Sequence, residues 1–234
     1  MNKIILLIFL SFILCLNGEE LAVQIDSRPA PNDILSKNTM KFFDEKTKKK
    51  TKHIELISKS MEDSKYQMIW FLKPADDKGV SFLKIEKDNE DDIMQMWLPR
   101  SKKLRRIKSS DKSDSFMGSD LSFEDLTNRN INEYIYNLKI DLIDCSYNEK
   151  LFQCYELESI PNISSEYSRH ITKVLEIEKN LYLAIYEESF DNGGKLLKAK
   201  HITYEKINNF YIMNSLEVTN VQEKHKTILS VGQI

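Results

Sequence analysis

The amino-acid sequence predicts a mainly β fold with one or two short helices, in which a single long antiparallel sheet must curl or close. Short turns separate about ten segments that have the alternating or continuously apolar pattern of strands. A twisted sheet of about ten strands does not stay flat. Several of these segments, such as residues 66–72, are apolar on both faces. One face of the sheet should therefore pack on a core or helix while the other lines something apolar.

Length and composition describe a protein that can build a sizeable core and has no dominant charge. The 234 residues suit one large β-rich domain, and 41% of them are hydrophobic. The formal net charge of -2 produces no global field that would attract nucleic acid or an anionic membrane. We therefore expect no nucleic-acid partner.

The N-terminal residues have the pattern of an export signal. Lys3 precedes an apolar run at residues 4–14, which suits the ~7–15-residue core of a signal peptide and is too short for a ~20-residue transmembrane helix. We predict a signal peptide at residues 1–18 and a single mature domain at residues 19–234. Cys15 leaves an alternative open, because a lipoprotein signal ends just before a cysteine that becomes acylated and anchors the chain.

The first part of the mature chain predicts a linker followed by an antiparallel meander. We expect a linker and a short helix at residues 28–38, and a solvated turn or strand edge in the basic run 45–53. Short turns at residues 74–79 and 99–101 then separate strands in consecutive hairpins. The predicted strands are residues 65–73, 80–86, 93–98 and 102–108.

The rest of the chain predicts one more helix start and further strands. Ser122 and Asp125 stand three positions apart and resemble a capping box that opens a short helix at residues 121–126. A turn at residues 191–195 predicts a hairpin. The remaining predicted strands are residues 133–140, 151–158, 168–177, 181–188, 196–204, 210–218 and 224–231.

Two cysteines lie in one predicted hairpin. Cys145 falls in residues 141–147 and Cys154 in residues 151–158. Opposed residues of a hairpin lie ~4.5–5.5 Å apart, which is close enough for a disulfide in an exported protein. Two separate buried thiols are the alternative.

Signals of enzymatic chemistry are missing from the sequence. None of the four histidines has the spacing of a metal site, and no nucleophile elbow or glycine-rich phosphate loop is present. We therefore predict a protein that is not an enzyme and that has no catalytic residues, no metal and no cofactor.

The basic stretch at residues 102–108 carries charge on both faces of a strand, so it forms no continuous cationic stripe. Aromatic residues that would stack on a single-stranded nucleic acid are also missing from it. Arg105 and Arg106 have two interpretations. They pair with nearby acidic residues, or they meet an anionic head group or a partner at the rim of the sheet.

A polar loop at residues 109–120 contains Phe116 and Met117, next to Gly118, which permits a sharp bend. Two large apolar side chains in such a loop must enter an apolar environment. They plug the mouth of a cavity, or they simply anchor a long loop on the core.

Three stretches, residues 71–85, 96–126 and 154–161, resemble the outer-membrane lipoprotein-sorting family related to LolA and LolB. The family usually has Trp-Leu-Tyr-Leu-Pro where residues 97–99 read Trp-Leu-Pro. The resemblance implies an incomplete, strongly curved β-barrel closed by short helices and a loop. It also implies an apolar cavity for the acyl chains of lipoproteins or lipids, which the protein would deliver through the periplasm toward the outer membrane.

The resemblance also suggests partners. Family members often accompany exporters of the resistance-nodulation-division type, so an inner-membrane exporter is a candidate partner. The alternative function is an accessory protein of such an exporter that carries no lipid. Contact with the membrane would be transient, or would occur through an acylated Cys15.

Strand alternation nominates residues for the cavity without deciding which face of the sheet lines it. An acyl chain binds by buried area, at about 0.8 kcal/mol per CH₂. The predicted cavity residues are the large apolar side chains Trp70, Leu83, Met96, Trp97, Phe116 and Met117.

Overall fold

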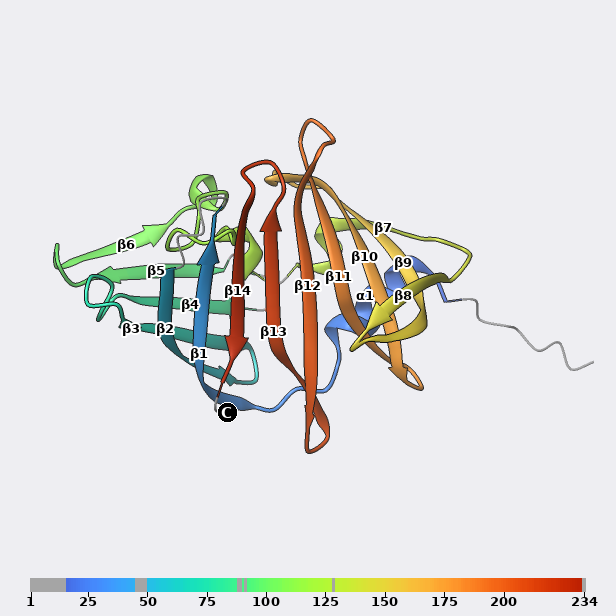
Figure 1. Cartoon of the computed structure of the whole chain (residues 1–234), viewed down its shortest axis with the longest axis horizontal. Helices are drawn as coiled ribbons and strands as arrows, with labels where there is room; N and C mark the ends of the chain where they lie inside the picture. The colour runs from blue at the N-terminus through green and yellow to red at the C-terminus, as the bar shows by residue number, and fades with distance from the viewer. Residues whose placement is uncertain (1–15, 45–49, 88–89, 91, 128, 233–234) are drawn as a thin grey trace, which may run out of the picture.

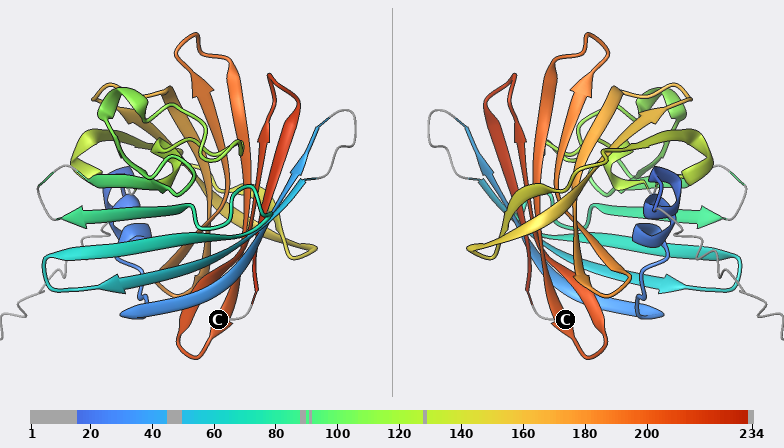
Figure 2. Two further views of the ribbon diagram at one scale, coloured as in Figure 1. Left: turned by 90° about the vertical axis from the view of Figure 1, so that its left-hand side faces the viewer. Right: turned by 90° about the vertical axis from the view of Figure 1, so that its right-hand side faces the viewer.

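The computed structural model consists of one strongly curved antiparallel sheet with short helices on its inner side (Figures 1 and 2). It describes residues 16–44, 50–87, 90, 92–127 and 129–232. The strands are β1 (Asp33–Phe43), β2 (Lys50–Ser60), β3 (Ser64–Lys73), β4 (Ser81–Lys87), β5 (Ile93–Leu98), β6 (Lys103–Ile107), β7 (Tyr134–Leu138), β8 (Ile143–Tyr147), β9 (Lys150–Pro161), β10 (Tyr167–Glu178), β11 (Leu181–Asp191), β12 (Leu196–Ile207), β13 (Phe210–Asn220) and β14 (His225–Val231).

The sheet consists of two meanders that join side by side. The strand order is β6-β5-β4-β3-β2-β1-β14-β13-β12-β11-β10-β9-β7, and β8 pairs with β9. The meanders β1–β6 and β9–β14 meet where Met40 of β1 lies opposite Leu229 of β14. In the described part of the chain the end strands β6 and β7 do not pair with each other, so the sheet stays open. The predicted mainly β fold with a curved, incompletely closed sheet is confirmed.

Helix α1 (Gly18–Asp26) packs on the inner face near one end of the sheet (Figure 2). The Asn17 side chain caps it, and Glu20 completes the capping box. Leu21 and Ala22 are its buried apolar residues. They form a cluster with residues of β9, β10 and β11, namely Leu157, Val174 and Tyr182. No helix among the described residues is long and apolar enough to cross a membrane.

A long connection between β6 and β7 crosses the inner face of the sheet, and we call its described residues, 108–127 and 129–133, the covering segment. It contains three single turns of 3-10 helix, η1 (Ser109–Asp111), η2 (Glu124–Leu126) and η3 (Ile131–Glu133). The predicted capping pair is present, since Asp125 Oδ2 accepts from the Ser122 amide at 2.9 Å and the Asp125 amide donates to Ser122 Oγ at 3.3 Å. It opens only the single turn η2.

The predicted linker is present at residues 28–32, but the short helix predicted after it was wrong, because β1 begins at Asp33. The strand was missed since two of its inward-facing residues, Ser36 and Asn38, are polar although they are 3% and 4% exposed. Their polarity hid the period-two pattern of a strand. Residues 45–49 of the basic run lie outside the described residues, and the rest of the run opens β2.

Cys145 of β8 and Cys154 of β9 form a disulfide, with their Cα atoms 5.9 Å apart. The two cysteines are not directly opposed in the hairpin. Cys145 lies opposite Phe152, and Cys154 lies opposite Ile143. The bond therefore joins diagonal neighbours and ties β8 to the long strand β9.

Candidate binding cavity

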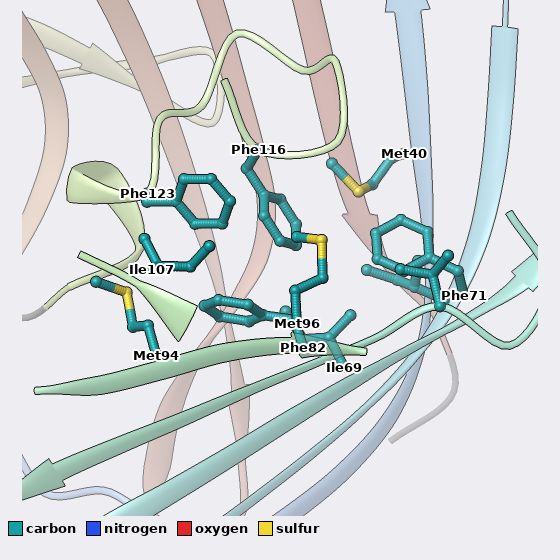
Figure 3. Close-up of a cluster of buried hydrophobic side chains, with 11 residues drawn as sticks. Met40, Ile69, Phe71, Phe82, Met94, Met96, Ile107, Phe116 and Phe123 are labelled. Atoms are coloured by element: carbon teal, nitrogen blue, oxygen red, sulfur yellow. The ribbon is translucent and has the colours of Figure 1, made fainter. Parts of the chain in front are cut away.

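One half of the inner face, on β1–β6, is largely apolar and filled (Figure 3), although β1 contributes the buried polar residues Ser36 and Asn38. Ile69, Phe82 and Met96 lie opposite one another on β3, β4 and β5, and all three are buried. Two rings of the covering segment pack onto this row, because the ring centroids of Phe116 and Phe123 lie 5.2 and 5.9 Å from that of Phe82. Together with neighbouring side chains they form one buried cluster, which we call the apolar cluster.

Three of the six predicted cavity residues belong to this region. Met96 and Phe116 are in the apolar cluster, and Met117 packs against it while half-buried. The loop around them is held by hydrogen bonds, since the Phe116 amide donates to the carbonyl of Leu121 at 2.7 Å and Lys52 Nζ donates to that of Met117 at 2.7 Å. Their role toward acyl chains stays a prediction.

The other three predicted residues face the opposite way. Trp70 is the neighbour of buried Phe71, Leu83 of Phe82 and Trp97 of Met96. Because consecutive residues of a strand point to opposite faces, these three side chains lie on the outer face of the sheet. The sequence pattern gave two faces of similar apolarity, and nothing in the alternation marked the inner one.

The other half of the inner face carries a buried charged cluster formed by Asp125, Arg129, Glu187, Lys198 and Lys200. Arg129 binds both carboxylate oxygens of Glu187, at 2.6 and 2.7 Å. Lys200 Nζ lies 2.7 Å from Asp125 and 3.0 Å from Glu187. Lys198 Nζ lies 2.9 Å from Asp125. The two covering-segment residues are thereby tied to β11 and β12.

Mutual pairing keeps this cluster ionised at neutral pH. Burial alone would raise the pKa of Asp125, but Lys200 and Lys198 hold it below its ordinary value. In the same way burial opposes the charge of Glu187, and Arg129 and Lys200 outweigh it, so the pKa of Glu187 is lowered. Burial would lower the pKa of Lys200, but the two carboxylates raise it.

His170 lies beside the charged cluster and has one nitrogen without a partner. Burial, with the nearby Arg129 guanidinium, lowers the pKa of His170 to about 3, so the ring is neutral. Its Nδ1 lies 3.1 Å from Arg129 Nη2 and 2.9 Å from Ser189 Oγ. Since a guanidinium only donates, Nδ1 accepts and the proton sits on Nε2. That nitrogen is buried and has no hydrogen-bond partner among the described residues.

A cavity of about 480 Å³ lies between the charged cluster, α1 and the sheet. Arg129, Glu187, Lys200 and His170 border it on one side. Its apolar lining comes from α1 and from strands on both sides of it, namely Ala22, Ile25, Leu157, Ile202, Met213 and Leu216. None of the six predicted cavity residues lines it. The cavity is therefore amphipathic, and none of its lining residues belongs to the apolar cluster.

The cavity continues into a wider outer space of about 700 Å³, in whose lining acidic residues outnumber basic ones. Asp26, Glu124 and Arg129 border both spaces. Burial raises the pKa of Asp26, and so does the charge of Glu86 at the same mouth. Within the described part of the chain, no group of three or more histidine, cysteine or carboxylate side chains could hold a metal ion.

The two arginines predicted for the rim have different surroundings. Arg105 donates to Asp114 at 2.9 Å and to Asp111 at 3.4 Å, so it fixes the start of the covering segment. Arg106 lies opposite Gln95 on the outer face, and no ion pair of its side chain is found in the described residues. A contact of either with a head group or partner stays a prediction.

Sequence reasoning missed the charged cluster, although a signal was present. Lys198 and Lys200 alternate with apolar residues in β12, so the period-two pattern placed the lysines on one face. Lysines are normally assigned to the solvent side, whereas here both are less than 10% exposed. Arg129 and Asp125 come from a loop far away in sequence, and only the fold brings them to these lysines.

Comparisons with known proteins agree with this architecture. A family model described as "Uncharacterized protein" matches residues 62–234. A DUF1329 family protein from Desulfovibrio piger is 28% identical with a TM-score of 0.81, and 92% of this chain covers 90% of that chain. A protein domain from Vibrio parahaemolyticus, described as outer membrane lipoprotein-sorting, is 26% identical with a TM-score of 0.82 and the same coverage.

A third similar structure shows the fold alone. It is a LolA superfamily protein from Nitrosomonas europaea, 15% identical with a TM-score of 0.67, and 94% of this chain covers 93% of that chain. None of the curated proteins matches the chain. The predicted resemblance to lipoprotein-sorting proteins is confirmed, and the prediction of a protein that is not an enzyme agrees with it.

Proposed function

We propose a carrier function from one premise: the chain belongs to the family whose model matches residues 62–234, and its fold is that of LolA-like lipoprotein-sorting proteins. In this proposal the protein binds acyl chains of lipids or lipoproteins and delivers them through the periplasm toward the outer membrane. The observation that carries the proposal is the cavity of about 480 Å³ on the inner face of the half-barrel.

The size and lining of the cavity suit part of an acyl chain. Cavities that bind small molecules measure about 300–1,000 Å³. Burial of ten methylene groups contributes about 8 kcal/mol, at ~0.8 kcal/mol each. Association costs about 4–15 kcal/mol, so a chain of this length binds reversibly. Displacement of the covering segment, which carries Phe116 and Met117, would open space beside Met96, and we retain these three as residues that a longer chain would contact.

The charged side of the cavity suits the polar end of the same cargo molecule. A fully apolar ligand would leave the buried Nε2–H of His170 without an acceptor, at a cost of about 1–3 kcal/mol. An ester or amide carbonyl oxygen would satisfy it. We therefore propose an amphiphile with its chain against Ile202 and Leu216 and an acceptor oxygen near His170.

We also propose that the chain is exported and that processing leaves α1 intact. Cys15 lies outside the described residues. Leu16 packs against the cluster below α1, and Asn17 caps the helix. Cleavage after Gly18 would remove both residues, whereas cleavage before Cys15 would keep both. The structure thus favours the lipoprotein alternative, in which an acylated N-terminus tethers the carrier.

Native mass spectrometry with lipid extraction tests the carrier function directly. Protein purified without detergent from an exporting host should carry a phospholipid or acylated peptide near 1:1. Ala184 lines the cavity and half-buried Ala199 lies on β12 outside it, so they give matched variants. Ala184→Trp should reduce the bound fraction, and Ala199→Trp should leave it unchanged.

The opposite outcome is equally clear. A clean ligand-free mass, with no uptake of added lipid by the folded protein, would contradict the carrier function. It would favour an accessory protein of an envelope exporter. Equal loss of lipid in both tryptophan variants would show that the cavity near Ala184 is not the binding site.

A further inference from the structure

The outer face of the sheet has an apolar row across four neighbouring strands of the first meander. The register places Trp70, Ser81, Trp97 and Leu104 opposite one another on β3, β4, β5 and β6. Directly opposed residues share one face of a sheet. Trp70 and Trp97 are the only two tryptophans of the chain, so both stand on the outer face with the small Ser81 between them.

The row is partly exposed to solvent, and further apolar side chains surround it. Leu104 is 61% exposed and Trp97 is 39% exposed. A second row joins Leu35, Ile57, Met68 and Leu83 on β1–β4. We define the outer patch as the side chains of these two rows together with Tyr66 and Leu72: Leu35, Ile57, Tyr66, Met68, Trp70, Leu72, Leu83, Trp97 and Leu104.

The outer face of the second meander is different, so the patch does not follow from the fold itself. There the register joins Lys173, Tyr186, His201 and Glu217 across β10–β13. This row is polar, as expected for the solvent side of an antiparallel sheet. Large contiguous apolar surfaces on a soluble protein indicate a binding site for a protein or a membrane.

The charges beside the patch indicate which of these partners it fits. Around Leu104, the exposed cations without an ion pair in the described part of the chain are Lys102, Lys103, Arg106 and Lys108. Arg105 is neutralised by Asp111 and Asp114, and Glu55 is the carboxylate at the far end of the tryptophan row. A second copy that docked with its two-fold axis near Leu104 would bring these cations close to their own equivalents, which is repulsive.

We propose that the outer patch docks the protein on an anionic membrane surface, with Trp97 and Leu104 at the head-group level and Arg106 on lipid phosphates. Tryptophan, tyrosine and basic side chains favour this interface, where one end of a side chain is apolar and the other is wet. The patch lies on the opposite face of the sheet from the cavity. Docking therefore leaves the inner face free, and the proposal does not depend on the identity of a cargo.

The fluorescence of the two tryptophans, which both lie in the outer patch, reports on contact between the patch and lipid. Vesicles of phosphatidylglycerol and phosphatidylcholine should shift the tryptophan emission to shorter wavelength and float with the bound protein. Brominated lipid in the vesicles should quench the emission. Pure phosphatidylcholine vesicles should bind at least tenfold less, and added salt should weaken binding to the anionic vesicles. Flotation separates docking from lipid extraction, because a carrier that only removes a lipid molecule stays behind in the dense layer.

Matched variants locate the contact. The double variant Trp97→Ser with Leu104→Ser should lower vesicle binding at least tenfold, because it removes the most exposed part of the patch. Arg106→Glu should lower binding to anionic vesicles only. Leu151→Ser is the control, since Leu151 is 83% exposed on β9, far along the sheet from the patch. It should bind as the unaltered protein does.

Several outcomes would overturn the proposal. The proposal is wrong if the unaltered protein fails to float with anionic vesicles, or if it floats without quenching by brominated lipid. Alternatively, Leu151→Ser would lose as much binding as the double variant. Analytical ultracentrifugation tests whether a second copy of the chain occupies the outer patch instead of a membrane. A dimer that Leu104→Ser dissociates would assign the patch to a second copy of the chain. If the double variant fails to fold, the quenching of the unaltered protein still decides.

Discussion

Replacement of Phe116 by alanine tests whether the loop at residues 109–120 is anchored on the core or is a movable plug of the cavity. The side chain is 1% exposed. Its ring centroid lies 5.2, 5.7 and 5.9 Å from those of Phe82, Phe123 and Phe71. Truncation of a buried phenylalanine costs about 3–5 kcal/mol. We expect Phe116→Ala to fall in that range, because this ring joins the covering segment to the apolar cluster.

Met117→Ala is the matched control on the adjacent residue. Met117 is half-buried and its backbone φ is 54°, which alanine would share. Truncation there should cost about 1 kcal/mol, since a partly exposed side chain loses less burial. The contrast between two neighbouring residues separates loss of packing from disturbance of the loop itself.

Equilibrium unfolding in urea, followed by circular dichroism, measures both variants. With an m-value of about 2 kcal/mol per M, Phe116→Ala should lower the midpoint by about 1.5–2.5 M. A loss below about 1 kcal/mol for Phe116→Ala, with a clear loss of lipid binding, would refute this reasoning. It would show that the ring is a removable plug of the cavity and not part of the core.

Three other predictions concern titration, cross-linking and processing. The pKa of His170 is lowered to about 3, so below about pH 6.5 the unfolded chain binds a proton that the folded chain excludes. As the pH is lowered from about 6.5 toward 3, the free energy of unfolding should decrease by about 1 kcal/mol per pH unit. His170→Gln should flatten this dependence, measured by urea unfolding at each pH. Replacing both Cys145 and Cys154 by alanine should cost about 2–3 kcal/mol, measured by thermal unfolding, because the bond closes a short loop. Mass spectrometry of the mature chain should find Asn17 retained, and its absence would contradict processing before Cys15.

The sequence was sufficient for most of the sheet, although it missed β1 and β2, because strand patterns are local. Residues 93–98 were predicted and observed as β5 with the same bounds, and the predicted 181–188 and 210–218 fall inside β11 and β13. Gly193 and Gly194 marked the hairpin between β11 and β12, where Asp191 Oδ1 accepts from the amide of Gly193. Alternation and turn residues need only neighbours along the chain, so no knowledge of the fold was required.

The cavity could not be predicted because its residues come from distant parts of the chain. Arg129 and Glu187 are 58 positions apart, and Asp125 and Lys200 are 75 apart. Each of these residues, taken alone, has the pattern of a solvated side chain. Choosing the inner face also failed for Trp70, since a strand that is apolar on both sides carries no local mark of which side curves inward.

The covering segment connects both halves of the inner face, and this sets how a cargo could enter. The rings of Phe116 and Phe123 fix it to Phe82 of the apolar cluster, and Asp125 fixes it to Lys198 and Lys200 of β12. If the segment detaches as one unit, loss of one anchor should already release much of the other. Asp125→Asn alone should cost about 3–5 kcal/mol, because it leaves two buried ammonium groups poorly compensated.

A double-mutant cycle tests this coupling. We expect Phe116→Ala combined with Asp125→Asn to cost less than the sum of the single variants, by about 1 kcal/mol or more, because the two sites share one movable element. Urea unfolding of the four proteins gives the coupling free energy. Additive costs, within about 0.5 kcal/mol, would show that the anchors respond independently. In that case the cavity opens at one end of the segment only, and a partner that triggers release would need to contact only that end.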